Sequence, residues 1–337
     1  MKKVFLLLFV LNIVFFAEFG YIIPGNAESS PIVKWDLPHF IPPNHFIAKD
    51  LYQFTEGLEA KTNGKFKIVY HPGSSLLKGP QTAPALVAGR VPIAPILTPY
   101  VYDLFPKLGV TYLPFLTSSY QELRVSAEKL RSYFYKVLGE KNLKPLFTYA
   151  WTTQQLFSNK PMATVAAWKG KKVRIFNEQQ ADLCKRVKAV PINIAASEIY
   201  TAMQRGTMDS LITANINIVP MKLYEVSKYA NQWTINGGGL EFMCVNMDAY
   251  NKLPQEYQKA LLEFVEESGI GYKIWDHCAK ADENSINELK SMGMTILYPS
   301  KAEIEKMRNI SRPIWDKWAK KNGTEDLLKK MLEAVGP

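Results

Sequence analysis

The sequence predicts an α/β protein of two lobes, each a mainly parallel sheet flanked by helices. Residues 170–213 read as strand, helix, strand, helix, strand, and residues 32–97 show the same order of elements. Strands joined through a helix lie parallel, so each stretch predicts a parallel sheet of its own. The chain has 337 residues, enough for two packed lobes rather than one core.

The N-terminus has the pattern of a secretory signal peptide. Lys2 and Lys3 precede an apolar run over residues 4–16, and residues 25–27 form a small-x-small cleavage pattern. We therefore expect residues 1–27 to be a signal peptide that is cleaved after Ala27 on export. A retained membrane anchor is the alternative, which is disfavoured because the apolar run falls short of about 18 uninterrupted residues.

Charge, cysteine and histidine content disfavour several classes of function. The formal net charge is +10, but the lysines are scattered singly and in pairs, which favours a solvated surface over nucleic-acid binding. The four histidines show no metal-ligand spacing, so we expect no metal and no cofactor. At most one disulfide can form among Cys184, Cys244 and Cys278, and for Cys184 and Cys278 a buried, unpaired thiol is favoured.

The first lobe begins with alternating strand and helix patterns. A strand over 32–37 leads into a proline-rich loop, and a helix over about 45–61 ends at Thr62-Asn63-Gly64. A strand over 65–71, a helix over 80–88 that stops at Gly89, and a strand over 92–97 follow.

The middle of the chain predicts two crossings between the lobes. After a helix over 119–139, the polar segment 151–155 should enter the second lobe, and Gly237-Gly238-Gly239 should carry the chain back. A helical pattern from Leu253 to near Gly293 is long enough to span both lobes; two shorter helices explain it nearly as well. The predicted lobes are residues 28–150 plus about 239–280, and residues 151–238 plus about 281–337.

The second lobe presents an arginine in the middle of a predicted strand. Arg174 lies within 172–176, followed by a helix over 177–187, a strand over 191–194, a short helix capped by Ser197 and a strand over 208–213. Both faces of a parallel sheet are normally covered, so Arg174 would be poorly hydrated unless an anion meets it. From the pattern alone, a structural ion pair or a solvated sheet edge explains Arg174 equally well.

Several short motifs stand in a fixed order along the chain. They are Gly170-Lys171-Lys172-Val173-Arg174, residues 197–209 (SEIYTAMQRGTMD), residues 222–226 (KLYEV), Asn63-Gly64-Lys65, residues 112–115 (YLPF), and Val245-Asn246 followed by Leu253-Pro254. Together they resemble the motifs of DctP-type TRAP transporter substrate-binding proteins over nearly the whole mature chain. The resemblance implies a periplasmic-binding-protein-like fold, a periplasmic location, an organic acid ligand, and integral membrane permease subunits as partners, driven by an ion gradient and not ATP.

The resemblance also implies a ligand site around Arg174, whose guanidinium would pair with a carboxylate. Asn177 matches a ligand-contacting asparagine of sialic-acid-binding members, and it is also a plausible helix cap, with Gln180 in the capping-box position. Three positions depart from those members: Gln154 replaces a second arginine, Thr213 an asparagine, and Leu97 an acidic residue.

These departures favour a monocarboxylate with an apolar or aromatic body, because a sugar acid or a dicarboxylate would leave polar groups unpaired. Aromatic side chains near the strand ends could hold such a body, although core packing explains each of them about as well. The predicted ligand-binding residues are Arg174, Gln154, Asn177, Thr213, Trp151, Phe176, His39, Phe40, Thr98 and Tyr100.

Other functions explain the sequence less well. An enzyme would need an activated nucleophile or a paired acid and base, but Ser197 has no histidine partner or nucleophile elbow, and Asp209 has no second carboxylate nearby. We therefore expect a binding protein, with no catalytic residue. A periplasmic sensory module for the same ligand class remains an alternative, as does a receptor for dicarboxylates or sugar acids.

Overall fold

The computed structural model describes residues 31–194 and 198–336. The predicted signal peptide and the predicted Ser197 cap lie outside the described residues. The strands are β1 (Val33–Pro38), β2 (Phe66–His71), β3 (Ile93–Ile96), β4 (Leu143–Ala150), β5 (Gln154–Ser158), β6 (Lys172–Ile175), β7 (Val190–Asn193), β8 (Ser210–Ala214), β9 (Tyr229–Asn236), β10 (Leu240–Asn246) and β11 (Thr295–Leu297).

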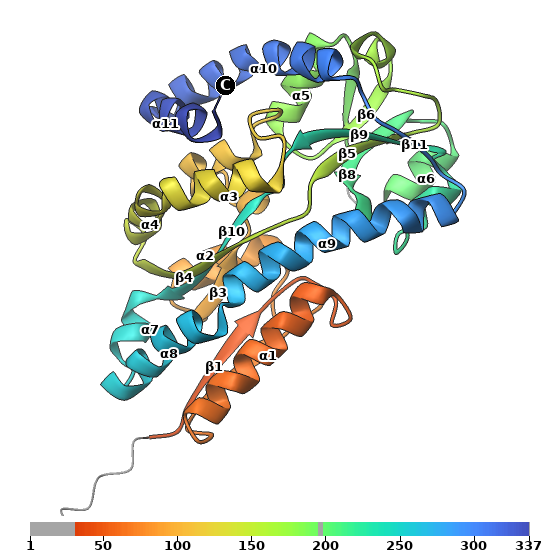
Figure 1. The fold of residues 1–337 in the computed structure, drawn as a ribbon. Helices are drawn as coiled ribbons and strands as arrows, with labels where there is room; N and C mark the ends of the chain where they lie inside the picture. The colour runs from red at the N-terminus through yellow and green to blue at the C-terminus, as the bar shows by residue number, and fades with distance from the viewer. Residues whose placement is uncertain (1–30, 195–197, 337) are drawn as a thin grey trace, which may run out of the picture. The chain divides into compact units, whose positions relative to one another are not determined.

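The α-helices alternate with these strands along much of the chain (Figure 1). They are α1 (Phe46–Lys61), α2 (Gly79–Val87), α3 (Tyr120–Lys129), α4 (Arg131–Gly139), α5 (Glu178–Arg186), α6 (Ile199–Gln204), α7 (Met247–Asn251), α8 (Gln255–Ser268), α9 (Ile270–Ser291), α10 (Lys301–Asn322) and α11 (Glu325–Val335). Short 3-10 helices cover Thr98–Tyr100, Pro106–Tyr112, Val165–Trp168, Asn215–Asn217 and Leu223–Glu225.

The predicted α/β architecture of two lobes is confirmed, and each lobe has its own strands. One sheet has the order β11-β9-β5-β8-β6-β7, and the other strands form the sheets β3-β10-β4 and β1-β2. β6 lies parallel to both β7 and β8, as the strand-helix-strand pattern predicts. β1 lies parallel to β2 for the same reason.

Two strands depart from the expected parallel pairing. β5 is antiparallel to β8 and β9, and β10 is antiparallel to β3 and β4. Each enters its sheet directly from a crossing segment, without a helix in between. Each crossing joins strands of different sheets, so no strand-helix-strand unit sets the direction of β5 or β10 within its own sheet.

The two crossings lie close together and are tied to a helix. Residues 151–153 join β4 to β5, and residues 237–239 join β9 to β10. Asp282 of α9 holds the first crossing, because its Oδ2 accepts hydrogen bonds from the Thr153 amide at 2.9 Å, the Thr153 hydroxyl and the Tyr120 hydroxyl. The aspartate thus joins α3, α9 and the crossing strand at one buried point.

The glycines of the return crossing are needed for close packing as well as for freedom of the backbone. A Cβ at Gly237 would overlap the backbone of Ser119, and one at Gly239 would overlap the hydroxyl of Tyr112. Gly238 adopts a positive φ of 108°, a conformation that residues with side chains rarely take. The segment therefore has room only for glycine.

The helical pattern from Leu253 to near Gly293 forms two helices, so the alternative of two shorter helices is confirmed. Gly269 takes the left-handed conformation, with φ 56°, and separates α8 from α9. α9 alone still reaches both lobes, since it packs against β4 and against β11. Figure 1 shows α9 running alongside the strands of both lobes.

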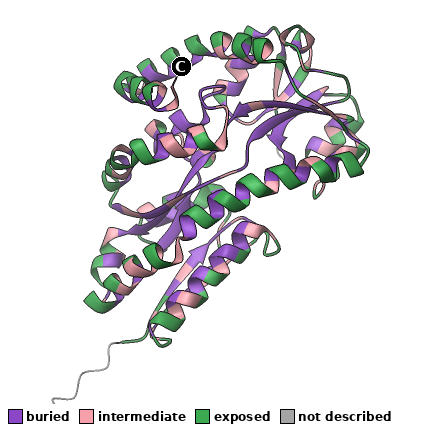
Figure 2. Ribbon diagram, in the orientation of Figure 1, coloured by how far each residue is buried: buried purple, intermediate pink, exposed green. Residues whose placement is uncertain are grey.

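Burial follows this arrangement. Figure 2 shows the strands buried and the outer faces of the helices exposed. The three cysteines, in α5, α9 and β10, are unpaired and fully buried, as predicted for Cys184 and Cys278. Within residues 31–194 and 198–336, no helix combines the length and the hydropathy that a membrane span requires.

We predict that Gly239→Ala destabilises the protein by about 2–4 kcal/mol, because the new methyl group would displace the Tyr112 hydroxyl from its packed position. Gly139→Ala is the matched control, since nothing lies within 4 Å of the added Cβ. Chemical denaturation of both variants measures the difference. Equal stability of the two variants would contradict the close approach at Gly239.

Candidate functional site

Arg174 is half-buried in β6, and no carboxylate of the described residues forms an ion pair with it. Its Nη1 donates to the carbonyl oxygen of Ile212 at 3.3 Å, whereas its Nε is buried without a hydrogen-bond partner. Burial lowers the pKa of the guanidinium, an effect that nearby Tyr100 partly opposes. Arginine nevertheless stays charged in proteins, and a buried cation without an anion is costly. The site therefore has the electrostatics of an anion-binding site.

Aromatic rings gather close to Arg174. Phe176 follows Arg174 by two residues, and its ring centroid lies 5.8 Å from the Arg174 Cζ. Phe40 contacts both Trp151 and Tyr100, at centroid distances of 5.9 and 6.0 Å. The structure thus brings together four predicted aromatic residues from segments far apart in the sequence.

Gln154 and Thr213 lie at the ends of neighbouring strands, where the β5–β8 register pairs Gln154 with Ala214. Both residues are buried and already make local hydrogen bonds. The side-chain amide nitrogen of Gln154 donates to the Thr152 carbonyl oxygen at 3.1 Å, and the Thr213 hydroxyl accepts from the side-chain amide nitrogen of Asn217 at 3.0 Å. Each retains further hydrogen-bonding capacity, because an amide has four such positions and a hydroxyl three.

His39 and Thr98 are fully buried and make internal hydrogen bonds. His39 Nδ1 accepts from the Ile41 amide at 3.1 Å, and its Nε2 lies 3.4 Å from the Tyr149 hydroxyl. Burial, reinforced by His45, lowers the pKa of His39 to about 3, so the ring is neutral at physiological pH. The Thr98 hydroxyl donates to the Leu240 carbonyl oxygen. These contacts position the segments that carry Phe40 and Tyr100.

Asn177 caps α5, as its sequence context predicts. Its Oδ1 accepts from the Gln180 amide at 2.8 Å, and the Gln180 side chain accepts in return from the Phe176 amide at 3.1 Å. The reciprocal contact therefore reaches one residue further back than in a standard capping box. The cap fixes the turn between β6 and α5, which carries Phe176 and Asn177.

The structure adds a buried acid that the sequence analysis did not single out. Glu241 of β10 accepts hydrogen bonds from the Thr98 amide and the Tyr112 hydroxyl, each at 2.8 Å. Burial raises the pKa of this carboxyl to about 8, although both hydrogen bonds act in the opposite direction. Glu241 is therefore mostly neutral at pH 7. In the sequence, this glutamate could have been noticed as the one acidic residue in the otherwise apolar run 240–245, which begins directly after three glycines.

A cavity of about 480 Å³ is lined in part by the predicted residues Tyr100, Phe176 and Asn177, whereas Arg174 and the other six predicted residues do not line it. Ligand pockets commonly fall in this range of size. Among the described residues, no group of three or more histidine, cysteine, aspartate or glutamate side chains could hold a metal ion.

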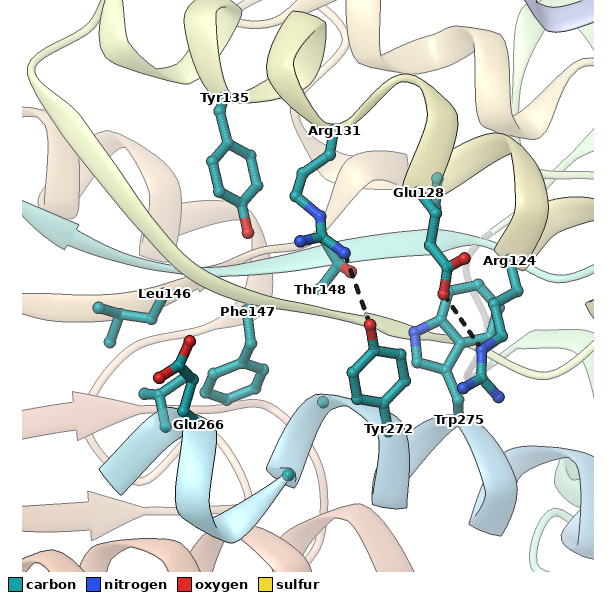
Figure 3. A pocket seen from close by; sticks show the side chains of 14 residues that line it. Arg124, Glu128, Arg131, Tyr135, Leu146, Phe147, Thr148, Glu266, Tyr272 and Trp275 are labelled. Carbon is teal, nitrogen blue, oxygen red and sulfur yellow. Dashed lines mark hydrogen bonds and ion pairs between the residues drawn. The ribbon is translucent and has the colours of Figure 1, made fainter. Parts of the chain in front are cut away.

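A second cavity, of about 350 Å³, lies between α3, α4 and the junction of α8 with α9 (Figure 3). None of the predicted ligand-binding residues lines it. Arg124 in this cavity is paired with Glu128 at 3.5 Å, and Arg131 donates to the Tyr272 hydroxyl at 3.5 Å. The candidate site is therefore the group around Arg174.

We predict that Glu241→Gln flattens the dependence of stability on pH. The pKa of Glu241 is raised from 4.5 to about 8, so the stability gained from its proton is complete below about pH 4.5 and is lost as the pH rises through 8. In this pH range the folded state binds up to one proton more than the unfolded state at Glu241. This difference contributes up to about 1.4 kcal/mol per pH unit to the slope of stability against pH, and the glutamine variant lacks it. Chemical denaturation of the wild type and the variant between pH 5 and 8 measures how their stability depends on pH. Identical slopes of stability against pH would contradict a neutral Glu241.

The chain matches the model of the family DctP, described as bacterial extracellular solute-binding protein, family 7, over residues 37–322. It is 26% identical over 316 residues to the C4-dicarboxylate-binding periplasmic protein DctP of Rhodobacter capsulatus, covering 90% of this chain and 91% of the relative.

Solved structures show the same fold. An extracytoplasmic solute receptor of Bordetella pertussis, which binds pyroglutamic acid, superposes with a TM-score of 0.80 at 24% identity, covering 90% of this chain and 99% of the receptor. A TRAP periplasmic solute binding protein of Desulfovibrio salexigens, with bound orotic acid, gives a TM-score of 0.78 at 21% identity, covering 90% and 98%. Because the family match spans most of the sequence, this chain belongs to the DctP family of bacterial extracellular solute-binding proteins.

Proposed function

We propose that this protein captures a small organic acid, specifically an aromatic or otherwise apolar monocarboxylate, between two closing lobes in the periplasm. It then delivers the acid to the integral membrane permease subunits of a TRAP-type transporter. The observation that carries the proposal is the half-buried guanidinium of Arg174, which has no acid partner among the described residues. The family is one of solute receptors and not of enzymes.

The hydrogen bonds of Arg174 leave one edge of its guanidinium available for a carboxylate. Nη1 is bound to the Ile212 carbonyl oxygen, which fixes the orientation of the planar group. The buried Nε has no partner. A carboxylate would meet the edge that carries Nε, where two parallel charge-assisted hydrogen bonds are possible.

The other predicted residues divide into two roles. Gln154, Asn177 and Thr213 supply amide and hydroxyl groups that orient the bound acid. Phe40, Tyr100, Trp151 and Phe176 supply ring surface for its apolar body, and Phe40 already contacts Trp151 and Tyr100. His39 and Thr98 would act indirectly, because their polar groups hold neighbouring backbone.

The chemistry of the relatives' ligands supports an organic acid without fixing which one. The Bordetella pertussis receptor binds pyroglutamic acid, and the Desulfovibrio salexigens protein holds orotic acid. Both acids carry one carboxyl group on a ring. The Rhodobacter capsulatus relative is a C4-dicarboxylate-binding protein, which makes dicarboxylates the second candidate class for this chain.

Lobe closure would occur at the crossings of the chain. We assign residues 28–150 plus about 239–280 to the first lobe, and residues 151–238 plus about 281–337 to the second. Support for this division comes from the sheets, because the crossings 151–153 and 237–239 lead from one set of strands to the other. Residues 1–27 would direct export and be removed.

We predict that the mature protein is stabilised against heat by at least one member of a panel of aromatic and aliphatic monocarboxylates. A ligand at 100 times its dissociation constant adds about 2.7 kcal/mol to stability. Thermal unfolding with each acid measures the shift. If only dicarboxylates or sugar acids raised the melting temperature, the assigned ligand class would be wrong.

We further predict that Arg174→Ala weakens binding of the stabilising acid by about 30-fold or more, because removal of one partner of a buried charge pair costs about 2–5 kcal/mol. Arg205→Ala, at an exposed arginine, is the control and should bind normally. Calorimetric titration gives both affinities. An unchanged affinity in Arg174→Ala would remove its assigned role.

A further inference from the structure

We propose that His45 is a positioning residue of the ligand site, which holds the Trp151 ring in the orientation that receives the flat body of an aromatic acid. The inference rests on the proposed function, since Trp151 is one of the rings assigned there to the apolar body of the ligand. His45 is not among the predicted ligand-binding residues, so it adds a determinant of specificity to that site.

The His45 imidazole lies parallel to the Trp151 ring. The two ring centroids are 5.6 Å apart, and the ring planes differ by 8°. Phe40 also contacts Trp151, but its ring is tilted by 40° at a centroid distance of 5.9 Å. Offset parallel stacking is one of the geometries that aromatic pairs prefer, and it constrains the planes of both rings. His45 is therefore the neighbour that sets the plane of the Trp151 ring.

The imidazole is itself held in place by the start of α1. Its Nδ1 accepts a hydrogen bond from the Ile47 amide at 3.2 Å and so caps the helix. The His45 amide donates to the Pro42 carbonyl oxygen at 3.1 Å, and the His45 carbonyl oxygen accepts from the Lys49 amide at 3.1 Å. The Phe46 ring also stacks on the imidazole, at a centroid distance of 4.4 Å. The imidazole is therefore a fixed support for the ring stacked on it.

The support is an aromatic ring without a charge. Burial lowers the pKa of His45 to about 4, so the imidazole is neutral at pH 7. Because Nδ1 accepts a hydrogen bond, the single ring proton lies on Nε2. Burial lowers the pKa of His39 as well, to about 3, so these two imidazoles do not repel each other. The contact with Trp151 is therefore a stack of two neutral rings and not a cation–π contact.

Trp151 joins this support to the crossings of the chain. It is the first residue of the crossing 151–153, and its amide donates to the carbonyl oxygen of Gly239, in the return crossing, at 2.8 Å. Trp151 is only partly buried, so some of its surface remains for a ligand to cover. A side chain that is ordered before binding loses less freedom when the ligand arrives, which favours affinity.

A flat acid depends on the orientation of Trp151 more than a saturated acid does. Two aromatic rings gain energy beyond their buried area only in stacked or edge-to-face arrangements. Burial of a saturated ring is favourable without a preferred direction. Loss of the His45 ring should therefore reduce the preference for aromatic acids, rather than the affinity for all acids.

The test uses two matched pairs of acids, benzoate with cyclohexanecarboxylate and phenylacetate with cyclohexylacetate, in calorimetric titrations. His45→Asn removes the ring and keeps a strongly preferred helix cap. It should weaken binding of each aromatic acid about threefold to tenfold, and binding of the saturated partner by less than about twofold. Ser300→Asn exchanges the residue that caps α10 and is the matched control, which should change no affinity.

Two further experiments separate the ring from the cap and identify the route of the effect. His45→Phe keeps a ring but loses the cap acceptor, so it should lower the melting temperature and still bind the aromatic acids normally. In a Trp151→Leu background, His45→Asn should have no further effect on binding, because its effect passes through the indole.

The outcomes separate this inference from the proposed function. Three results in a wild type that binds these acids would overturn the role of His45 and leave the ligand class intact. They are equal weakening of both members of a pair, or of neither, in His45→Asn; weakened aromatic binding in His45→Phe; and an undiminished effect of His45→Asn in the Trp151→Leu background. If no acid of either pair binds the wild type, the assigned ligand class fails and the inference fails with it.

Discussion

A guanidinium that is half withdrawn from water needs an anion, and Arg174 has none among the described residues. It lies on β6, between β7 and β8 in the sheet. One of its nitrogens is held by a backbone carbonyl at 3.3 Å, so the rest of the group is presented in a fixed direction. This guanidinium therefore carries an electrostatic cost that a bound carboxylate would relieve.

The second lobe was largely predictable because its signals are local. An asparagine cap, alternating strand residues and glycine stops lie within a few positions of the elements they define. Glu241 was not predictable in this way. Its buried environment is created by Thr98 and Tyr112, which lie 143 and 129 residues away in sequence. The same holds for Tyr102, which lines a cavity together with Glu178 and Gln179 of α5.

The break between α8 and α9 shows a different limit. The sequence is explained by one long helix or by two shorter ones, and the conformation of Gly269 decides between them. Gly269 turned left-handed, whereas Gly271 stayed helical and lies so close to the Thr148 carbonyl that a side chain would not fit. Because α9 begins only after this break, Asp282 lies at its middle, where it binds Thr153 of the crossing strand and Tyr120 of α3.

Asn177 has two roles, since its side-chain oxygen caps α5 and the residue also lines the cavity. Apart from glycine, only serine, threonine, aspartate and asparagine are strongly preferred at the start of a helix. Evolution can therefore vary the cavity at this position within a set of four side chains, two hydroxyls, one carboxylate and one amide, without losing the helix. Tyr102 lines the same cavity without capping a helix, so a substitution there changes the cavity and leaves the start of α5 intact.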